Sequence, residues 1–248
     1  MLDAQVESVN IVGYQTIEAT GRHLSSGATF ITVGSQDAEW RLGDVVAVGM
    51  DPSTDIIQFL STANAKTILS ATYIDAATDA DLGEGDGALI GWWDPNDLGG
   101  TRLDNEVFAT GQGFLCNFTS TGVSLIYSGE VLQGETELNL SGLKHPMIVN
   151  HTPVDLTLGD VSAIGMDPST DIIQLLSLDN AKTVLSATYI DAATDADLGE
   201  GDGALIGWWD PNDLGGTRLD DTPFPAGTAF LANFTSTSVK IVFPDPMP

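Results

Sequence analysis

Leu69–Asp104, with the sequence LSATYIDAATDADLGEGDGALIGWWDPNDLGGTRLD, decides the fold of this chain because it occurs twice. It returns unchanged at Leu185–Asp220, an offset of 116 positions (185 − 69 = 116). Widening the comparison to 42–104 and 158–220 adds only six differences, three of which exchange one apolar residue for another. A fixed offset is typical of repeat proteins, so the chain consists of two copies of one module.

Each copy reads as a series of short strands. Runs rich in β-branched and aromatic residues, such as 56–60 and 67–74, alternate with Gly-, Pro- and Asp-rich turns at the spacing of antiparallel sheets. Helical periodicity is weak, and we expect a single helical turn near 42–48. Residues 113–118 and 123–127 predict a closing hairpin.

The predicted fold class is therefore all-β, with two tandem antiparallel sandwich-like or barrel-like repeats at 1–128 and 129–248. At the same offset, 13–15 aligns with 129–131, so the last strand of the first copy should run directly into the first strand of the second. No Gly/Ser- or Pro-rich linker intervenes, which indicates that the copies pack against each other or share a strand. The leading segments 16–41 and 132–157 have diverged, as expected if one packs at the joint and the other meets another chain.

Charge and cysteine content exclude several classes of function. Eight basic residues stand against 35 acidic ones, and the net charge of −27 disfavours nucleic acids and anionic membrane surfaces. No apolar run is long enough to span a bilayer, so we expect no membrane insertion. Cys116 is the only cysteine and has Ala232 as its counterpart, which predicts a small buried apolar residue and no intramolecular disulfide.

An acidic, glycine-rich loop is the densest cluster of charge in each copy. Carboxylates crowded on such a loop repel one another unless a cation lies among them, and alternating oxygen ligands suit Ca²⁺. The spacing does not match the helix–loop–helix calcium motif. We therefore predict a generic calcium site in each copy, with a solvated turn as the alternative. The candidate ligands are Asp79, Asp81, Glu84 and Asp86 in the first copy and Asp195, Asp197, Glu200 and Asp202 in the second.

Paired tryptophans are the second chemical feature. Trp92 and Trp93 recur as Trp208 and Trp209. Neighbouring side chains in a strand face opposite sides, so one Trp of each pair should fill the core while the other is at least partly exposed. An exposed Trp beside the acids and amides of the next turn could stack on a sugar ring. Packing in the core or at an interface is the alternative interpretation.

Enzymatic chemistry has little support in the sequence. His23, His145 and His151 have no histidine counterpart 116 positions away, which argues against a duplicated active site that uses histidine. No nucleophile elbow, phosphate loop or metalloprotease helix motif is present. Carboxylates are so numerous that no particular pair stands out as an acid/base pair. We therefore expect that the protein is not an enzyme.

Several short motifs carry a resemblance to a known group. In chain order they are Asn-Ile-Val-Gly-Tyr-Gln-Thr at 10–16, Asp-Ile-Ile-Gln-Phe at 55–59, Gly-Trp at 91–92, the Gly-Gln-Gly-Phe turn at 111–114 and Ser-Gly-Glu-Val at 128–131. The chain resembles uncharacterised secreted bacterial surface proteins that carry the Asn-Ile-Val-Gly-Tyr motif just after a signal peptide. In the second copy the turn departs from the pattern, with Gly-Thr-Ala-Phe at 227–230. The resemblance implies export to the extracellular space or cell surface and transfers no functional residue.

These observations favour an exported structural protein that assembles with copies of itself into a filament, sheath or surface layer. The β-prone segment 5–17 could add as a strand to the edge of a neighbouring subunit. Its assembly residues are Val9, Ile11, Val12 and Tyr14. The alternative is a secreted carbohydrate-binding module that uses the Trp pairs, with a glycan as its partner.

Overall fold

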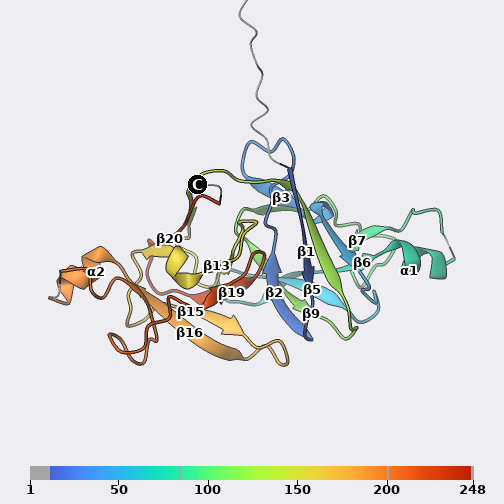
Figure 1. Ribbon diagram of the computed structural model, residues 1–248. Helices are drawn as coiled ribbons and strands as arrows, with labels where there is room; N and C mark the ends of the chain where they lie inside the picture. Colours follow the sequence, from blue (N-terminus) through green and yellow to red (C-terminus); the bar gives the residue numbers. More distant parts are fainter. Residues whose placement is uncertain (1–11, 84, 200, 247–248) are drawn as a thin grey trace, which may run out of the picture.

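The predicted all-β fold is confirmed by the computed structural model, in which 40% of residues are in strands and 8% in helices. The structure describes residues 12–83, 85–199 and 201–246. The first repeat lies on one side of the molecule and the second on the other, coloured from blue to green and from yellow to red in Figure 1.

The first repeat contains strands β1 to β10 and two short helices. The strands are β1 (Val12–Glu18), β2 (His23–Gly27), β3 (Glu39–Arg41), β4 (Val45–Val48), β5 (Ile56–Leu60), β6 (Thr67–Ile74), β7 (Gly91–Trp93), β8 (Val107–Ala109), β9 (Gly113–Asn117) and β10 (Ser124–Glu130). The helices are a 3₁₀ turn, η1 (Leu42–Asp44), where a helical turn was predicted, and α1 (Ala76–Asp81), which was not predicted.

The second repeat contains the corresponding elements. The strands are β11 (Thr136–Asn139), β12 (Met147–Val149), β13 (Leu156–Thr157), β14 (Ser162–Ile164), β15 (Ile172–Leu176), β16 (Thr183–Ile190), β17 (Gly207–Trp209), β18 (Pro223–Phe224), β19 (Ala229–Asn233) and β20 (Lys240–Phe243). The helices are η2 (Leu158–Asp160) and α2 (Ala192–Asp197).

Three antiparallel sheets form each repeat, and their strand orders correspond. In the first repeat the orders are β1-β10-β4, β2-β9-β5-β6-β7 and β3-β8. In the second they are β11-β20-β14, β12-β19-β15-β16-β17 and β13-β18. The leading segments have diverged in sequence but still supply the same edge strands. Each repeat has its own hydrophobic core, and Cys116 is fully buried in the first, as predicted.

The predicted hairpin at the end of each repeat is wrong, because β9 and β10 lie in different sheets. The fully buried carboxylate of Asp55 holds the turn between them. It accepts hydrogen bonds from the backbone N–H groups of Thr119 at 2.6 Å and Ser120 at 3.1 Å. Burial alone would raise the pKa of Asp55, but these hydrogen bonds outweigh it and lower the pKa. The anchored turn directs the chain from one sheet to the next.

The joint between the repeats differs from the prediction in one respect. β10 runs through the predicted boundary at 128/129, and the first strand of the second repeat, β11, begins only at Thr136. Residues 129–131 therefore do not start the second repeat, and the predicted direct run from the last strand of one copy into the first strand of the next is wrong. In the register of the sheets, Thr16 corresponds to Glu137, an offset of 121 (137 − 16 = 121). The offset falls to 116 at Leu42 and Leu158 because the leading segment of the second repeat is five residues shorter.

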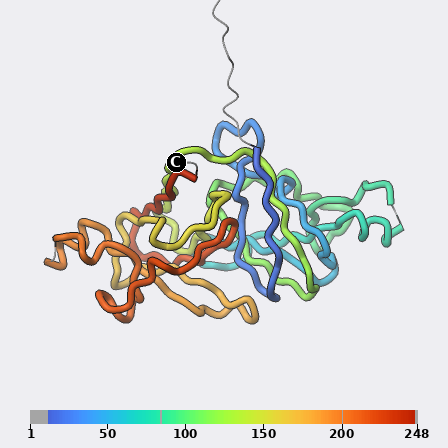
Figure 2. The backbone as a smooth tube through the Cα atoms, in the orientation of Figure 1, coloured from blue at the N-terminus to red at the C-terminus, as the bar shows by residue number. Residues whose placement is uncertain are grey.

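The two repeats pack against each other, as predicted, through reciprocal contacts. Backbone N–H groups in β2 donate hydrogen bonds to carbonyl groups of the second repeat. Equivalent N–H groups in and next to β12 donate hydrogen bonds to carbonyl groups of the first repeat. The paired bonds are His23 N–H to Leu178 O and His145 N–H to Thr62 O, both 2.7 Å, and Gly27 N–H to Gly227 O at 3.1 Å and Val149 N–H to Gly111 O at 3.2 Å. Such reciprocity defines a two-fold interface, which closes on itself. Accordingly, α1 and α2 project at opposite ends of the molecule (Figure 2; labels in Figure 1).

The register of the sheets also shows that two of the three histidines occupy equivalent positions in the two repeats. Phe118 N–H donates to Arg22 O, and its counterpart Phe234 N–H donates to Lys144 O, both at 2.8 Å. The residues that follow, His23 and His145, therefore occupy equivalent backbone positions at an offset of 122 (145 − 23 = 122). The prediction that no histidine has a counterpart in the other repeat is therefore wrong for His23 and His145, because the offset of 116 does not hold in the leading segment.

The reciprocal interface predicts a steric test at Gly27. A Cβ added at Gly27 would overlap Cγ2 of Val149, the buried residue at the equivalent position of the second repeat. We expect Gly27→Val to destabilise the protein by about 1–3 kcal/mol, as overpacked cores do. Urea unfolding followed by circular dichroism measures this. The exchange variant Gly27→Val/Val149→Gly should recover most of the loss, and an exchange variant as unstable as the single one would contradict the two-fold arrangement.

His151 predicts a component of the acid sensitivity. It is buried against Phe243, and its Nε2 lies 2.7 Å from Oγ1 of Thr136. Burial lowers the pKa of His151 from 6.5 to about 4, so the unfolded chain binds more protons between these values. Stability should then fall by up to about 3 kcal/mol as the pH drops from 6.5 to 4. In His151→Gln this component of the pH dependence of the unfolding free energy should disappear, and an unchanged pH slope would contradict the assignment.

Candidate functional site

The acidic loop begins with a capped helix. Asp75 caps α1 by accepting a hydrogen bond from Thr78 N–H at 2.8 Å, and it also accepts one from Gly49 N–H at 3.0 Å. An Asp followed by Ala-Ala is a helix-start signal that the sequence analysis did not use. Burial raises the pKa of Asp75, but these hydrogen bonds outweigh it and the pKa is lowered.

Two of the proposed calcium ligands in each repeat accept hydrogen bonds from backbone N–H groups of their own loop. Asp79 is buried and accepts hydrogen bonds from the backbone N–H groups of Gly87 at 3.0 Å and Leu89 at 3.1 Å. Asp86 accepts one from Ala88 N–H at 2.9 Å, whereas Asp81 is exposed. The equivalent residues Asp195, Asp202 and Asp197 repeat this arrangement.

The structure brings no metal-binding group together within its described residues: no three His, Cys, Asp or Glu side chains there are grouped so that they could hold a metal ion. Glu84 and Glu200 lie outside those residues. The calcium site therefore stays a prediction, and a calorimetric titration with millimolar Ca²⁺ tests it, since absence of both heat and a thermal shift would remove it.

The first tryptophan of each pair fills the core, as predicted. Trp92 is fully buried, and its indole Nε1 donates a hydrogen bond to Val45 O at 2.6 Å. Asp104 accepts the backbone N–H of Trp92 at 2.8 Å. Trp208 makes the corresponding bond to Val161 O at 2.7 Å.

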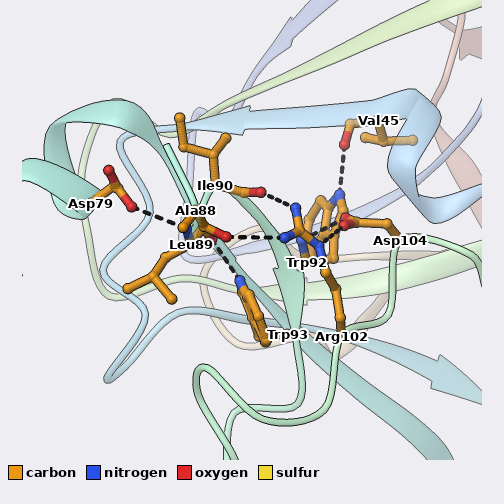
Figure 3. Close-up of polar contacts among 9 residues, drawn as sticks. All are labelled: Val45, Asp79, Ala88, Leu89, Ile90, Trp92, Trp93, Arg102 and Asp104. Carbon is orange, nitrogen blue, oxygen red and sulfur yellow. Dashed lines mark hydrogen bonds and ion pairs between the residues drawn. The ribbon is translucent and has the colours of Figure 1, made fainter. Parts of the chain in front are cut away.

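The second tryptophan is also buried, so the prediction that it is partly exposed is wrong. Trp93 is only 4% exposed and Trp209 5%. The guanidinium of Arg102 lies over the Trp93 ring, 5.1 Å from its centroid, while the indole Nε1 donates to Leu89 O at 2.7 Å (Figure 3). Arg102 is fixed in turn by hydrogen bonds to Asp104, Ala88 O and Ile90 O. The loop at Leu89 and the guanidinium of Arg102 thus cover Trp93 on the side of the strand where an exposed ring was predicted. No open ring for a sugar is offered by Trp92, Trp93, Trp208 or Trp209.

The most asymmetric surface is the outer face of the sheet β1-β10-β4, which we name the first-repeat face. Tyr14, 69% exposed, and Thr16 project from β1, Ile126 from β10, and Val46 and Val48 from β4. Thr16, Ile126 and Val46 form one row across the three strands. This row is β-branched, and Tyr14, Val46 and Val48 add exposed apolar area, while Glu18 and Ser124 lie at one end of the face. Exposed apolar patches are typical of interaction sites.

The same surface of the second repeat is more polar at its centre. The row equivalent to Thr16, Ile126 and Val46 consists of Glu137, Val242 and Ser162. In the adjacent row Asn139 pairs with Lys240, and the Lys240 ammonium forms an ion pair with Glu137 at 2.7 Å. In the first-repeat face the charged residues, Glu18 and Glu130, lie in the outer rows of the sheet. In the second repeat Glu137 lies in the row equivalent to Thr16, Ile126 and Val46.

The first-repeat face combines predicted and missed residues. Val12 and Tyr14 were predicted as assembly residues and both lie in β1, whereas Val9 and Ile11 are outside the described residues. Sequence reasoning missed the rest of the face. The signal was present, because Val46 and Ser162 are one of the six differences between otherwise near-identical segments.

A groove of about 650 Å³ opens at the joint between the repeats. Leu60 and Ile68 line it from the first repeat, and Leu138, Leu143 and Met147 from the second. Its volume matches that of small-molecule sites. None of the tryptophans named as sugar-binding candidates lines it.

Comparison of the chain with protein-family models, with curated proteins and with solved structures finds no match. Within the described residues, no helix is long and apolar enough to cross a membrane. The candidate function therefore rests on the geometry of the molecule itself.

The cover over Trp93 predicts a spectroscopic test. Removing the guanidinium in Arg102→Ala opens one face of the indole to water and removes a cation–π contact. We expect a red shift of tryptophan emission and a loss of stability of about 1 kcal/mol. Arg218→Ala, the matched variant over Trp209, should give the same result, and no spectral change in either variant would contradict the proposed shielding.

Proposed function

We propose that the chain is an exported structural protein that associates with copies of itself through the first-repeat face. The observation that carries this proposal is the contrast between the repeats. Where the first repeat exposes Val46, Ile126 and Thr16, the second presents Ser162, Val242 and Glu137. A difference in character between equivalent exposed sheets supports a contact that only one of the repeats makes.

The burial of the tryptophans weakens the carbohydrate-binding alternative. Stacking on a sugar requires an open aromatic ring, and the second ring of each pair is covered by arginine. The export component of the proposal rests on the opening motif at 10–16 and its resemblance to secreted surface proteins.

The internal contact between the repeats does not by itself extend into a polymer. It is reciprocal, so it closes within one chain, and matching ends cannot continue the same contact in the next molecule. A filament, sheath or layer therefore needs surfaces outside this joint, and the first-repeat face is such a surface.

Electrostatics sets the conditions for association. Each chain carries a net charge of −27, so two chains repel each other at low ionic strength. At 0.15 M salt the Debye length is about 8 Å, which screens all but the nearest charges. Association through an apolar face should consequently strengthen as salt is added.

Val46→Ser tests the face and leaves the fold intact, because the second repeat carries Ser162 at this position. Each contact between two faces loses two valine side chains, so the dissociation constant should rise at least about tenfold. Sedimentation velocity over a range of protein and salt concentrations measures this.

The matched control is Ile164→Ser, which removes an exposed apolar side chain from the equivalent strand of the second repeat. It should leave association unchanged. Native protein that remains a single-chain particle at every protein and salt concentration would overturn the proposed function.

A further inference from the structure

The open edge of β1 has a determined hydrogen-bonding polarity. Ala19, the residue after β1, donates its N–H to Val123 O at 2.8 Å, directly opposite in the register of β1 and β10. In an antiparallel ladder, hydrogen-bonded pairs alternate with non-hydrogen-bonded pairs. Gly13, Gln15 and Ile17 lie an even number of residues from Ala19, so their backbone N–H and C=O groups also form hydrogen bonds with β10.

The remaining residues of β1 turn their backbone groups to the open side. By the same alternation, the N–H and C=O groups of Val12, Tyr14, Thr16 and Glu18 point away from β10. The far end of β10 agrees: Glu130, opposite Val12, exchanges its two backbone bonds with Ile31 on the other side, at 3.0 and 2.9 Å. Within the described residues, no backbone group pairs with this edge.

The edge also lacks the features with which proteins protect exposed strands. β1 has seven residues and contains no Lys, Arg or Pro. Its counterpart β11 has four residues and carries Glu137, which is held in an ion pair with Lys240. Short strands and charges at an edge disfavour pairing with other chains. β1 is longer than β11, and its one charged residue, Glu18, lies at its end.

We propose that β1 pairs antiparallel with β1 of a second copy about a two-fold axis at Gln15, joining two three-stranded sheets into one of six strands. This inference rests on the proposed self-association and specifies its geometry. Full overlap of the strands places Val12 opposite Glu18 of the partner subunit and Tyr14 opposite Thr16 of the partner subunit. The four outward residues of each strand then form roughly eight hydrogen bonds between the chains.

Gln15 supports this register independently. Its side chain lies on the inner side of β1, and within the described residues its Oε1 is buried without a hydrogen-bond partner. On the two-fold axis the two Gln15 side chains are opposite each other in a non-hydrogen-bonded pair, where side chains approach most closely. Each amide can then donate from Nε2 to the Oε1 of the other, which satisfies the buried oxygen.

The charged residue of β1 itself does not oppose this arrangement. Glu18 is the only charged residue of β1, and the antiparallel overlap places the two Glu18 residues at opposite ends of the paired strands. Six residues of strand separate them by about 20 Å, well beyond a Debye length of about 8 Å at physiological salt.

The edge contact complements the contact through the first-repeat face. A two-fold axis between antiparallel neighbours is perpendicular to the sheet, so both outer faces lie on the same side of the six-stranded sheet. Edge pairing therefore doubles the apolar face that is available for stacking. Two different two-fold contacts on one chain can alternate and extend into an open assembly, which a single closed contact cannot.

Thr16→Pro tests the edge contact. Proline removes the outward N–H of Thr16 but no bond to β10, and edge strands tolerate proline at such positions. The matched control is Glu137→Pro, at the equivalent position of β11. We expect Thr16→Pro to weaken dimerisation at least tenfold in sedimentation equilibrium, Glu137→Pro to leave it unchanged, and both to keep the native circular dichroism spectrum.

Gln15→Cys in a Cys116→Ala background tests the register and does not depend on proline being tolerated. Ala is the natural residue at the equivalent position 232, so the background should fold. Opposed non-hydrogen-bonded residues lie within disulfide distance, and mild oxidation should link two chains through position 15. Ser128→Cys, an exposed residue of the neighbouring strand β10, should not be linked.

The outcomes separate the two proposals. Native protein that never associates overturns the proposed function and this inference together. Native protein that associates, with Thr16→Pro associating equally well and Gln15→Cys not linked, overturns edge pairing but leaves association through the first-repeat face. Loss of dimers in Thr16→Pro together with the disulfide at position 15 supports the two-fold edge contact.

Discussion

This structure depends on one constraint, which is that the backbone groups at the edges of its strands need hydrogen-bond partners. Every backbone N–H and C=O that leaves water must be paired, and an all-β chain has many edges. The two repeats meet part of this need by bonding each other, with β2 and β12 contributing equivalent reciprocal bonds across the joint. Gly27 makes this close approach possible, because a side chain there would overlap Val149. The two halves thus form one closed unit, and the edge of β1 remains on its surface.

Side chains of the types that often bind ligands or catalyse reactions stabilise the fold of each repeat. Asp79 holds its own loop, Asp55 anchors a turn between sheets, and Arg102 covers Trp93. A buried carboxylate that accepts several backbone N–H groups is stable as an anion and fixes backbone direction at the same time. The same internal network recurs in the second repeat. The repeats differ instead on an exposed sheet, where the replacement of Val46 by Ser162 changes a surface and leaves the core unchanged.

Much of the fold could be predicted from local sequence. The strands at 56–60 and 67–74 coincide with β5 and β6, and the helical turn near residue 42 is η1. The candidate surface was predicted only in part, through Val12 and Tyr14. The sequence did not predict the row formed by Thr16, Ile126 and Val46. These residues lie in three strands that are distant in sequence and become neighbours only because β10 pairs with both β1 and β4.

The sequence by itself determined the duplication, the all-β class and the acidic character, because these follow from composition, periodicity and a fixed offset. Only the tertiary structure decided which side chains are exposed and which segments correspond. Trp93 is buried because Arg102 folds back over it, and alternation along a strand carries no information about such a cover. His23 and His145 correspond only in the register of the sheets, since the leading segments differ in length. Exposure and correspondence depend on contacts between distant segments, whereas strand formation depends mainly on neighbouring residues.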